Sequence, residues 1–127
     1  MSTLKADTIV AADGSSPATL TGQYTAKAWV NFNGTGTVAV NESGNVSSIT
    51  DNGTGDYTTN FTSAISDANY TMVGGTNTPS GTTGNPGSPQ VYGTTPSMTT
   101  TSVRTTQFFS RSAAQQDTAY VGISVFR

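Results

Sequence analysis

The feature that most constrains the fold is a pair of Asn-Gly turns, each lying between short runs of aromatic and β-branched residues. The turn NGTG at 33–36 joins residues 28–32 to residues 37–40, and the turn DNGTG at 51–55 joins residues 46–50 to residues 57–61. Asn and Gly tolerate the positive φ of tight hairpin turns, so Asn-Gly between strand-like runs is a strong short-range signal for a β-hairpin. Helical periodicity is absent from this stretch, and the sequence predicts an all-β protein.

Further segments downstream also have the composition of strands. They are residues 70–73, which we expect to end at the glycine pair 74–75, a Thr-rich stretch split by Arg104 into 99–103 and 106–109, and the apolar closing run 119–126. Residues 111–118 are polar and predict a turn region. Together with the two hairpins, these segments predict a small antiparallel β-sandwich built from short hairpins.

Apolar residues at alternate positions identify the side of each strand that we expect to be covered. The closing run is apolar on both faces, which indicates a central strand or a strand at a subunit seam. Trp29 lies in mid-strand, where tryptophan is more often a core or interface residue than an exposed platform for a sugar ring. We expect core or subunit-interface positions at Trp29, Val30, Phe32, Tyr57, Phe61, Val121, Ile123 and Val125.

The composition fits one domain with a modest core. Of the 127 residues, 33% are hydrophobic and only 9% are charged, against roughly 25% charged in ordinary soluble domains. The net charge of −2 is small for a disordered chain, and the abundant threonine suits a half-buried sheet surface. Because few large apolar side chains are available, we expect further burial between identical chains, and hence an oligomer.

The same inventory argues against several classes of function. The chain has no cysteine and no histidine, so a Ser or Thr nucleophile would lack its usual base. Among the seven acidic residues the one suggestive pair is Asp51 and Asp56, which flank a turn and fit Asx-turns better than a calcium loop. The five basic residues are scattered, and apolar runs are too short to cross a membrane. We expect no enzymatic activity, cofactor, metal, nucleic-acid partner or membrane insertion.

Residues 1–26 predict an extended N-terminal arm ahead of a domain that spans residues 27–127. The arm has turn-forming residues at 13–17, and its apolar points are Leu4, Ile9, Val10 and Leu20. It is either a flexible or edge-strand terminus, or an element that docks onto a larger assembly or winds with identical copies.

Residues 74–97 predict one long loop rich in Gly, Pro and Thr. Proline removes hydrogen-bond donors from a sheet and glycine weakens strands, so a regular element is not expected here. Such a loop is a solvated connector, a recognition tip or a strap between subunits. Its candidate contact residues are Asn85, Gln90 and Tyr92.

The amino-acid sequence of the first half of the chain resembles that of a known kind of protein. The phrases AKAWVNFNGTGTVAV (26–40) and GNVSSITDNGTGDYTTNFTSAISDANY (44–70) resemble a module of bacteriophage tail-fibre and related appendage proteins, particularly in phages of cyanobacteria and other aquatic bacteria. The opening STLKADTIVAADGSSPATLTGQ (2–23) resembles the leader that often precedes this module. The resemblance covers residues 2–70 well and is loose from Val73 onward.

The resemblance implies a virion component that is made in the host cytoplasm and assembled there. Fibres of this kind are usually three-fold, so it implies a homotrimer, whose arm would attach to other tail or virion proteins. The function that we expect is that of a tail fibre or fibre tip contributing to attachment to a bacterial surface glycan or protein, where several weak sites gain affinity through avidity. The alternative is a capsid decoration or tail-joining protein with no receptor-binding role, and a tail appendage is favoured over the capsid surface.

Overall fold

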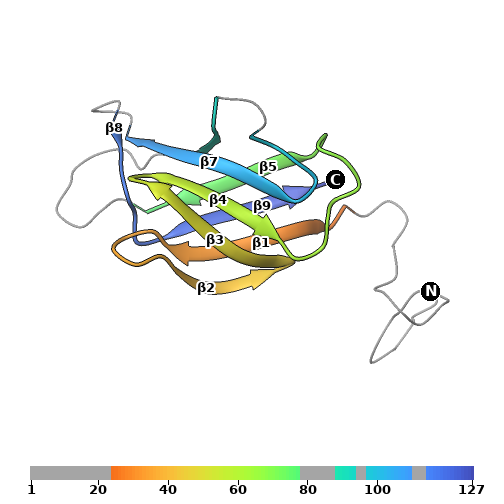
Figure 1. The fold of residues 1–127 in the computed structure, drawn as a ribbon, viewed down its shortest axis with the longest axis horizontal. Helices are drawn as coiled ribbons and strands as arrows, with labels where there is room; N and C mark the ends of the chain where they lie inside the picture. The colour runs from red at the N-terminus through yellow and green to blue at the C-terminus, as the bar shows by residue number, and fades with distance from the viewer. Residues whose placement is uncertain (1–23, 78–87, 94–96, 110–113) are drawn as a thin grey trace, which may run out of the picture.

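The computed structural model describes residues 24–77, 88–93, 97–109 and 114–127, and these residues form two antiparallel sheets (Figure 1). The all-β sandwich expected from the sequence is therefore confirmed. Residues 1–23 of the predicted arm, including Leu4, Ile9, Val10 and Leu20, lie outside the described residues, as does Asn85, whereas Ala26 at the end of that arm already belongs to the first strand.

Each sheet combines two neighbouring strands from the early part of the chain with two from the later part. One sheet has the order β2-β1-β9-β5 and the other the order β3-β4-β7-β6, with β8 paired to β7. The strands are β1 (Ala26–Asn33), β2 (Ala39–Gly44), β3 (Val46–Gly53), β4 (Asp56–Phe61), β5 (Thr71–Thr76), β6 (Pro89–Val91), β7 (Ser102–Phe109), β8 (Ala114–Gln115) and β9 (Val121–Phe126). β9 lies between β1 and β5, so the last strand of the chain is a central strand of the first sheet.

Both predicted hairpins are present. β1 pairs with β2, with Phe32 opposite Val40, and β3 pairs with β4, with Asp51 opposite Tyr57. The Asx-turn expected at Asp51 is also present, because Oδ1 of Asp51 accepts a hydrogen bond of 2.9 Å from the backbone N–H of Gly53. Local turn chemistry is thus sufficient to set both hairpins.

The prediction that a strand ends at the glycine pair 74–75 was wrong, because β5 continues through both glycines. Gly74 pairs with Ile123, and Gly75 pairs with Gly122. A Cβ at Gly74 would lie 2.9 Å from Cγ of Pro89 and 2.6 Å from the carbonyl oxygen of Gly122. A glycine in this strand therefore allows a close approach of β6 instead of ending the strand.

Two other expected boundaries also differ. Residues 74–97 are not one loop, because their first residues belong to β5 and β6 lies near their end. The break expected at Arg104 is absent, since β7 runs without interruption from Ser102 to Phe109. Arg104 lies opposite Thr58 of β4 within a continuous ladder, and its own N–H and carbonyl group bond to Ser97 and Tyr92 on the other side of β7.

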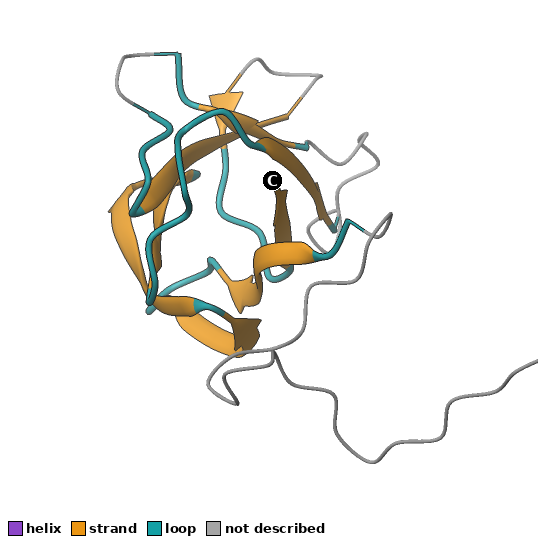
Figure 2. Ribbon diagram, turned by 90° about the vertical axis from the view of Figure 1, so that its right-hand side faces the viewer, coloured by secondary structure: helices purple, strands orange, loops and turns teal. Residues whose placement is uncertain are grey.

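The core lies between the inner faces of the two sheets, which enclose it in the end-on view of Figure 2. The rings of Phe32 and Tyr57 meet edge to face across it, with their centroids 5.2 Å apart. Seven of the eight residues expected in the core or an interface are buried here: Val30, Phe32, Tyr57, Phe61, Val121, Ile123 and Val125. The eighth, Trp29, is 39% exposed on the outer face, so it is not part of the core.

A single residue, Asn45, carries the chain from the first sheet to the second. It lies between the last residue of β2 and the first of β3 and has a φ of 55°. Its Nδ2 donates to the carbonyl oxygens of Lys27 at 2.9 Å and Ser63 at 3.1 Å, and its Oδ1 accepts from the N–H of Ser63 at 2.8 Å. Asn tolerates the left-handed conformation, and its amide binds the adjoining chain segments together.

The inner face of β7 offers a direct test of core energetics. Thr105 is fully buried, and its hydroxyl has no hydrogen-bond partner within the part of the chain that the structure describes. Thr105→Val keeps the side-chain shape and removes a buried, unpaired hydroxyl, so we expect the free energy of unfolding to rise by about 1 kcal/mol. The control is Thr106→Val, because Oγ1 of Thr106 accepts a 2.6 Å hydrogen bond from Gln115. Urea denaturation of the control should show a loss of stability, and a loss in Thr105→Val would contradict the prediction.

Candidate functional site

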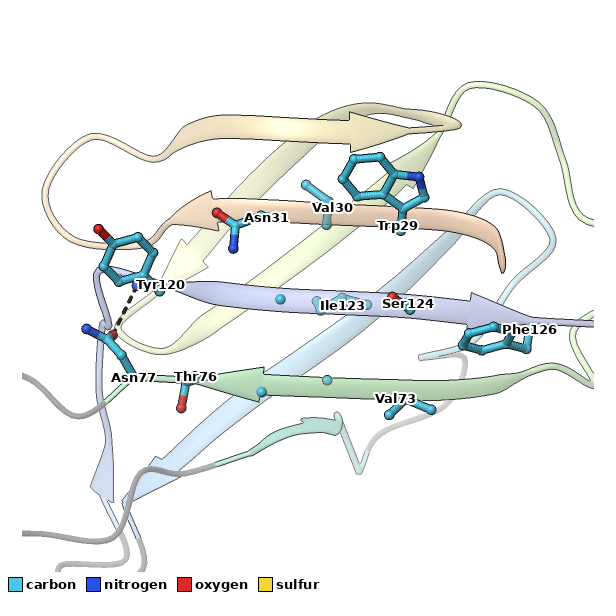
Figure 3. A pocket seen from close by; sticks show the side chains of 13 residues that line it. Trp29, Val30, Asn31, Val73, Thr76, Asn77, Tyr120, Ile123, Ser124 and Phe126 are labelled. Atoms are coloured by element: carbon cyan, nitrogen blue, oxygen red, sulfur yellow. Dashed lines mark hydrogen bonds between the residues drawn. The ribbon is translucent and has the colours of Figure 1, made fainter. Parts of the chain in front are cut away.

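An open groove crosses the outer face of β1, β9 and β5, on the side of the first sheet that the core does not cover (Figure 3). Strand pairing places its residues in rows. Trp29, Ser124 and Val73 form one row across the three strands, and Asn31, Gly122 and Gly75 form the next. The second row has two neighbouring glycines, so the sheet surface is low at this point. We call this feature the outer groove.

Tyr120 and Asn77 bound the outer groove at the end away from Trp29 (Figure 3). The N–H of Tyr120 donates to Oδ1 of Asn77 at 3.1 Å, and the N–H of Asn77 donates to the carbonyl oxygen of Tyr120 at 3.2 Å. This reciprocal pair continues the contact between the chain segments beyond the β5–β9 ladder. The ring of Tyr120 is 58% exposed, so Trp29 and Tyr120 place one aromatic ring on each side of the row that contains the two glycines.

The side chains at the Trp29 end have defined supports. Trp29 lies opposite Gly44 of β2, and a Cβ at Gly44 would overlap the indole ring, so the ring rests directly on the glycine. Next to it, Oδ1 of Asn31 accepts a 2.7 Å hydrogen bond from Nδ2 of Asn41. That bond orients the Asn31 amide with its nitrogen toward β9 (Figure 3). Both groups are therefore held in fixed positions on the surface of the sheet.

The outer groove is wide and electrically neutral. Its volume is about 530 Å³, and every residue that lines it is uncharged. Apolar rings and Val73 alternate with the amides of Asn31 and Asn77 and the hydroxyl of Ser124. A surface of this kind can stack on flat apolar faces and exchange hydrogen bonds with neutral polar groups, but it has no charged group to attract an ion.

A second hollow, of about 720 Å³, lies on β6 and β7 and includes two of the predicted contact residues, Gln90 and Tyr92. Gln90 is exposed, whereas the Tyr92 ring is half-buried under the guanidinium of Arg104 at 4.2 Å. Arg104 also donates two hydrogen bonds to the carboxylate of Asp56, of 2.9 and 2.6 Å. These bonds hold the pKa of Asp56 below its usual range. Tyr92 is thus part of a structural cluster, and Gln90 is the freer of the two.

The sequence interpretation found only part of the outer groove. Trp29 was considered as a ligand contact and placed instead in the core or an interface, and the closing run, which contains Tyr120 and Phe126, was described only as apolar on both faces. The contributions of Val73, Asn77 and the two central glycines were missed. Only the register between β5 and β9, which pairs residues far apart in the chain, brings these residues together.

Other kinds of site have little support within the described ranges. There, no group of three or more acidic residues is close enough to hold a metal ion. No helix in the same ranges is sufficiently long and apolar to pass through a membrane. Comparison of the chain with protein-family models, with curated proteins and with solved structures finds no match.

Proposed function

We propose that this chain is a bacteriophage virion protein, a component of a tail fibre or fibre tip that contributes to attachment to the host surface. The likeness of residues 2–70 to phage appendage modules supports the virion assignment. The observation that carries the attachment role is the outer groove, since Trp29 and Tyr120 present aromatic rings to solvent on a rigid sheet. Exposed aromatic groups on a supported surface are typical of recognition sites.

The proposal includes assembly into a homotrimer that joins other tail or virion proteins through residues 1–26. Apolar side chains outside the outer groove support association with identical copies, because Val91 and Phe108 are both partly exposed near one another on β6 and β7. Sedimentation of the purified full chain at micromolar concentration should give three times the protomer mass.

The position of the chain in the particle tests the proposed function. We expect gold-labelled antibodies raised against the purified chain to bind at the distal ends of tail appendages on particles that contain it. We also expect the folded chain, added to host cells first, to slow adsorption of these particles, whereas the heat-unfolded chain should not. Label spread over the capsid lattice, with adsorption unchanged, would instead support a capsid decoration or tail-joining protein without a receptor role.

A further inference from the structure

We propose that the outer groove binds a neutral oligosaccharide segment, with Trp29 and Tyr120 stacked on sugar rings and the amides of Asn31 and Asn77 bonded to sugar hydroxyls. This inference rests on the proposed function only in naming the host surface as the source of the glycan. The residues of the groove support the binding site independently of that function.

The backbone positions that carry the two rings are far enough apart for an extended ligand. Trp29 lies opposite Ser124 on β9, and Tyr120 precedes Ser124 by four residues, which corresponds to about 13 Å along an extended strand. Between the two rings, Gly122 and Gly75 lie side by side and bring no side chain to the surface. A chain of linked rings can therefore lie along the groove, supported at both ends and close to the backbone in the middle.

The chemistry of the lining matches that of a sugar chain. A pyranose ring has a face of C–H groups that can lie flat on an aromatic ring, and an edge of hydroxyls that can donate and accept hydrogen bonds. The outer groove alternates these two kinds of group, with Trp29 and Tyr120 providing faces and Asn31 and Asn77 providing amide donors and acceptors. The oxygens of these amides already accept hydrogen bonds within the protein, so a purely apolar ligand would cover their N–H groups without offering an acceptor, at a cost in binding free energy.

The absence of charged residues in the groove favours a neutral glycan over other ligands that contain rings. Stacking on aromatic side chains also occurs with single-stranded nucleic acid, but such sites have a positively charged groove that follows the phosphates. Here every lining residue is uncharged, and the overall net charge is −2. The same argument disfavours acidic polysaccharides, whose carboxylates or sulfates would meet no Lys or Arg in the groove.

Shape disfavours a two-fold contact with a second copy of this chain as the occupant, and the apolar side chains offered above for the trimer contact, Val91 and Phe108, lie outside the groove. A two-fold contact places the same patch against itself, which would set the low glycine row over another low row. Stable contacts between chains also bury roughly 800 Å² on each partner in close complementarity. A narrow ligand fills the space between Trp29 and Tyr120 better, and an open groove of this kind implies weak binding at each site, strengthened by several copies.

The first experiment is a screen with a printed array of purified bacterial surface polysaccharides, both neutral and acidic. We expect the full chain to be retained on neutral members and not on acidic ones. Retention on acidic members alone, or on none, would overturn the inference.

The second experiment locates the site, since Trp29 is the only tryptophan in the chain. Oligosaccharides released from the best neutral polysaccharide should change Trp29 fluorescence and protect it from acrylamide quenching. Tyr120→Ala should weaken this binding by about tenfold through the loss of one stacked ring. Tyr24→Ala is the matched control, because Tyr24 is 86% exposed and does not line the groove. Equal losses in both variants would contradict the assignment.

A substitution that fills the groove with a side chain, without disturbing the fold, gives a stronger test. A Cβ at Gly75 would meet no atom within 4 Å, and valine is favourable in a strand. Gly75→Val should retain the circular dichroism and thermal melting of the wild type while binding to the array falls below detection. Unchanged binding would show that the ligand lies elsewhere, and a loss of self-association in sedimentation would show that another copy occupies the groove.

The results separate failure of this inference from failure of the proposed function. Label at the tail tips, together with an outer groove that binds no neutral glycan, would overturn the glycan site alone. Groove-dependent glycan binding by the purified chain, together with particles that carry no label, would overturn the virion role alone.

Discussion

Gly55→Ala is expected to cause a large loss of stability, because glycine is required here for two separate reasons. The residue has a φ of +65°, and a side chain in the left-handed region costs about 1–2 kcal/mol. In addition, a Cβ would lie 2.6 Å from the backbone N of Gln116 and 3.0 Å from the backbone oxygen of Gln107. Neither backbone atom can rotate away, and overpacking of this kind adds about 1–3 kcal/mol. We expect the free energy of unfolding to fall by a total of roughly 2–5 kcal/mol.

The first hairpin supplies a matched control with the same local sequence. Gly36 ends a Gly-Thr-Gly segment as Gly55 does and has nearly the same φ, +66°, but a Cβ there would have no neighbour within 4 Å. Gly36→Ala should therefore cost only the conformational part, about 1–2 kcal/mol. Urea denaturation of both variants measures the difference. Equal losses would show that packing against Gln116 and Gln107 adds nothing.

Tyr57→Phe is expected to destabilise the protein and to change its response to alkaline pH. The buried hydroxyl lies 2.5 Å from Oδ1 of Asp117 and 2.8 Å from the carbonyl oxygen of Gly34, and shares one proton between them. Removing it deletes a hydrogen bond to a carboxylate, a loss of about 1.5–3 kcal/mol. Asp117 also accepts a 2.7 Å hydrogen bond from the N–H of Gly55, so the same carboxylate supports the turn described above.

The pH response follows from the protonation of Tyr57. Burial raises the pKa of Tyr57 above its usual value, and the hydrogen bond to Asp117 and the charge of that carboxylate raise it further. Above a pH of about 10, an unfolded tyrosine loses its proton while the folded one keeps it. The unfolded state then binds fewer protons, so stability falls as pH rises, by about 1.4 kcal/mol per pH unit for this residue.

Denaturation between pH 9 and pH 11 tests this expectation. The wild type should lose stability more steeply above pH 10 than Tyr57→Phe does. Tyr70→Phe is the comparison. Burial also raises the pKa of Tyr70, but its hydroxyl donates to a backbone carbonyl, that of Ser102, at 3.0 Å, and not to a carboxylate. We therefore expect Tyr70→Phe to flatten the loss of stability above pH 10 less than Tyr57→Phe does. Parallel curves for the wild type and Tyr57→Phe would mean that Tyr57 ionises equally in both states.

The two hairpins and the inner faces of the strands could be predicted because their causes are local. Asn-Gly turns impose their backbone conformation within a few residues, and a period of two separates Val30 and Phe32 from Trp29 on the same strand. What alternation does not decide is which face the second sheet covers. Trp29 was therefore placed in the core or an interface, although it lies on the uncovered face of β1.

The remaining errors concern partners that are distant in the chain. Glycines 74 and 75 usually indicate the end of a strand, but here they are accepted because Pro89 packs on the first and Gly122 lies beside the second. In the same way, Arg104 continues a strand because it reaches Asp56 diagonally across the neighbouring strand. Strand register and inter-strand partners of this kind are set by the complete fold, and a single sequence does not contain them in readable form.

The pairing of β1 with β9 has a mechanical consequence. Ala26 lies opposite Phe126 at one end of this antiparallel ladder, and Phe32 lies opposite Val121 at the other. A pull between Ala26 and Phe126 would peel the ladder open one rung at a time. Tension applied between a ligand on the outer groove and Ala26 would instead run along β1. It would load the backbone hydrogen bonds of β1 to β2 and β9 together. This shearing geometry resists a greater force than peeling, because many bonds must break at once.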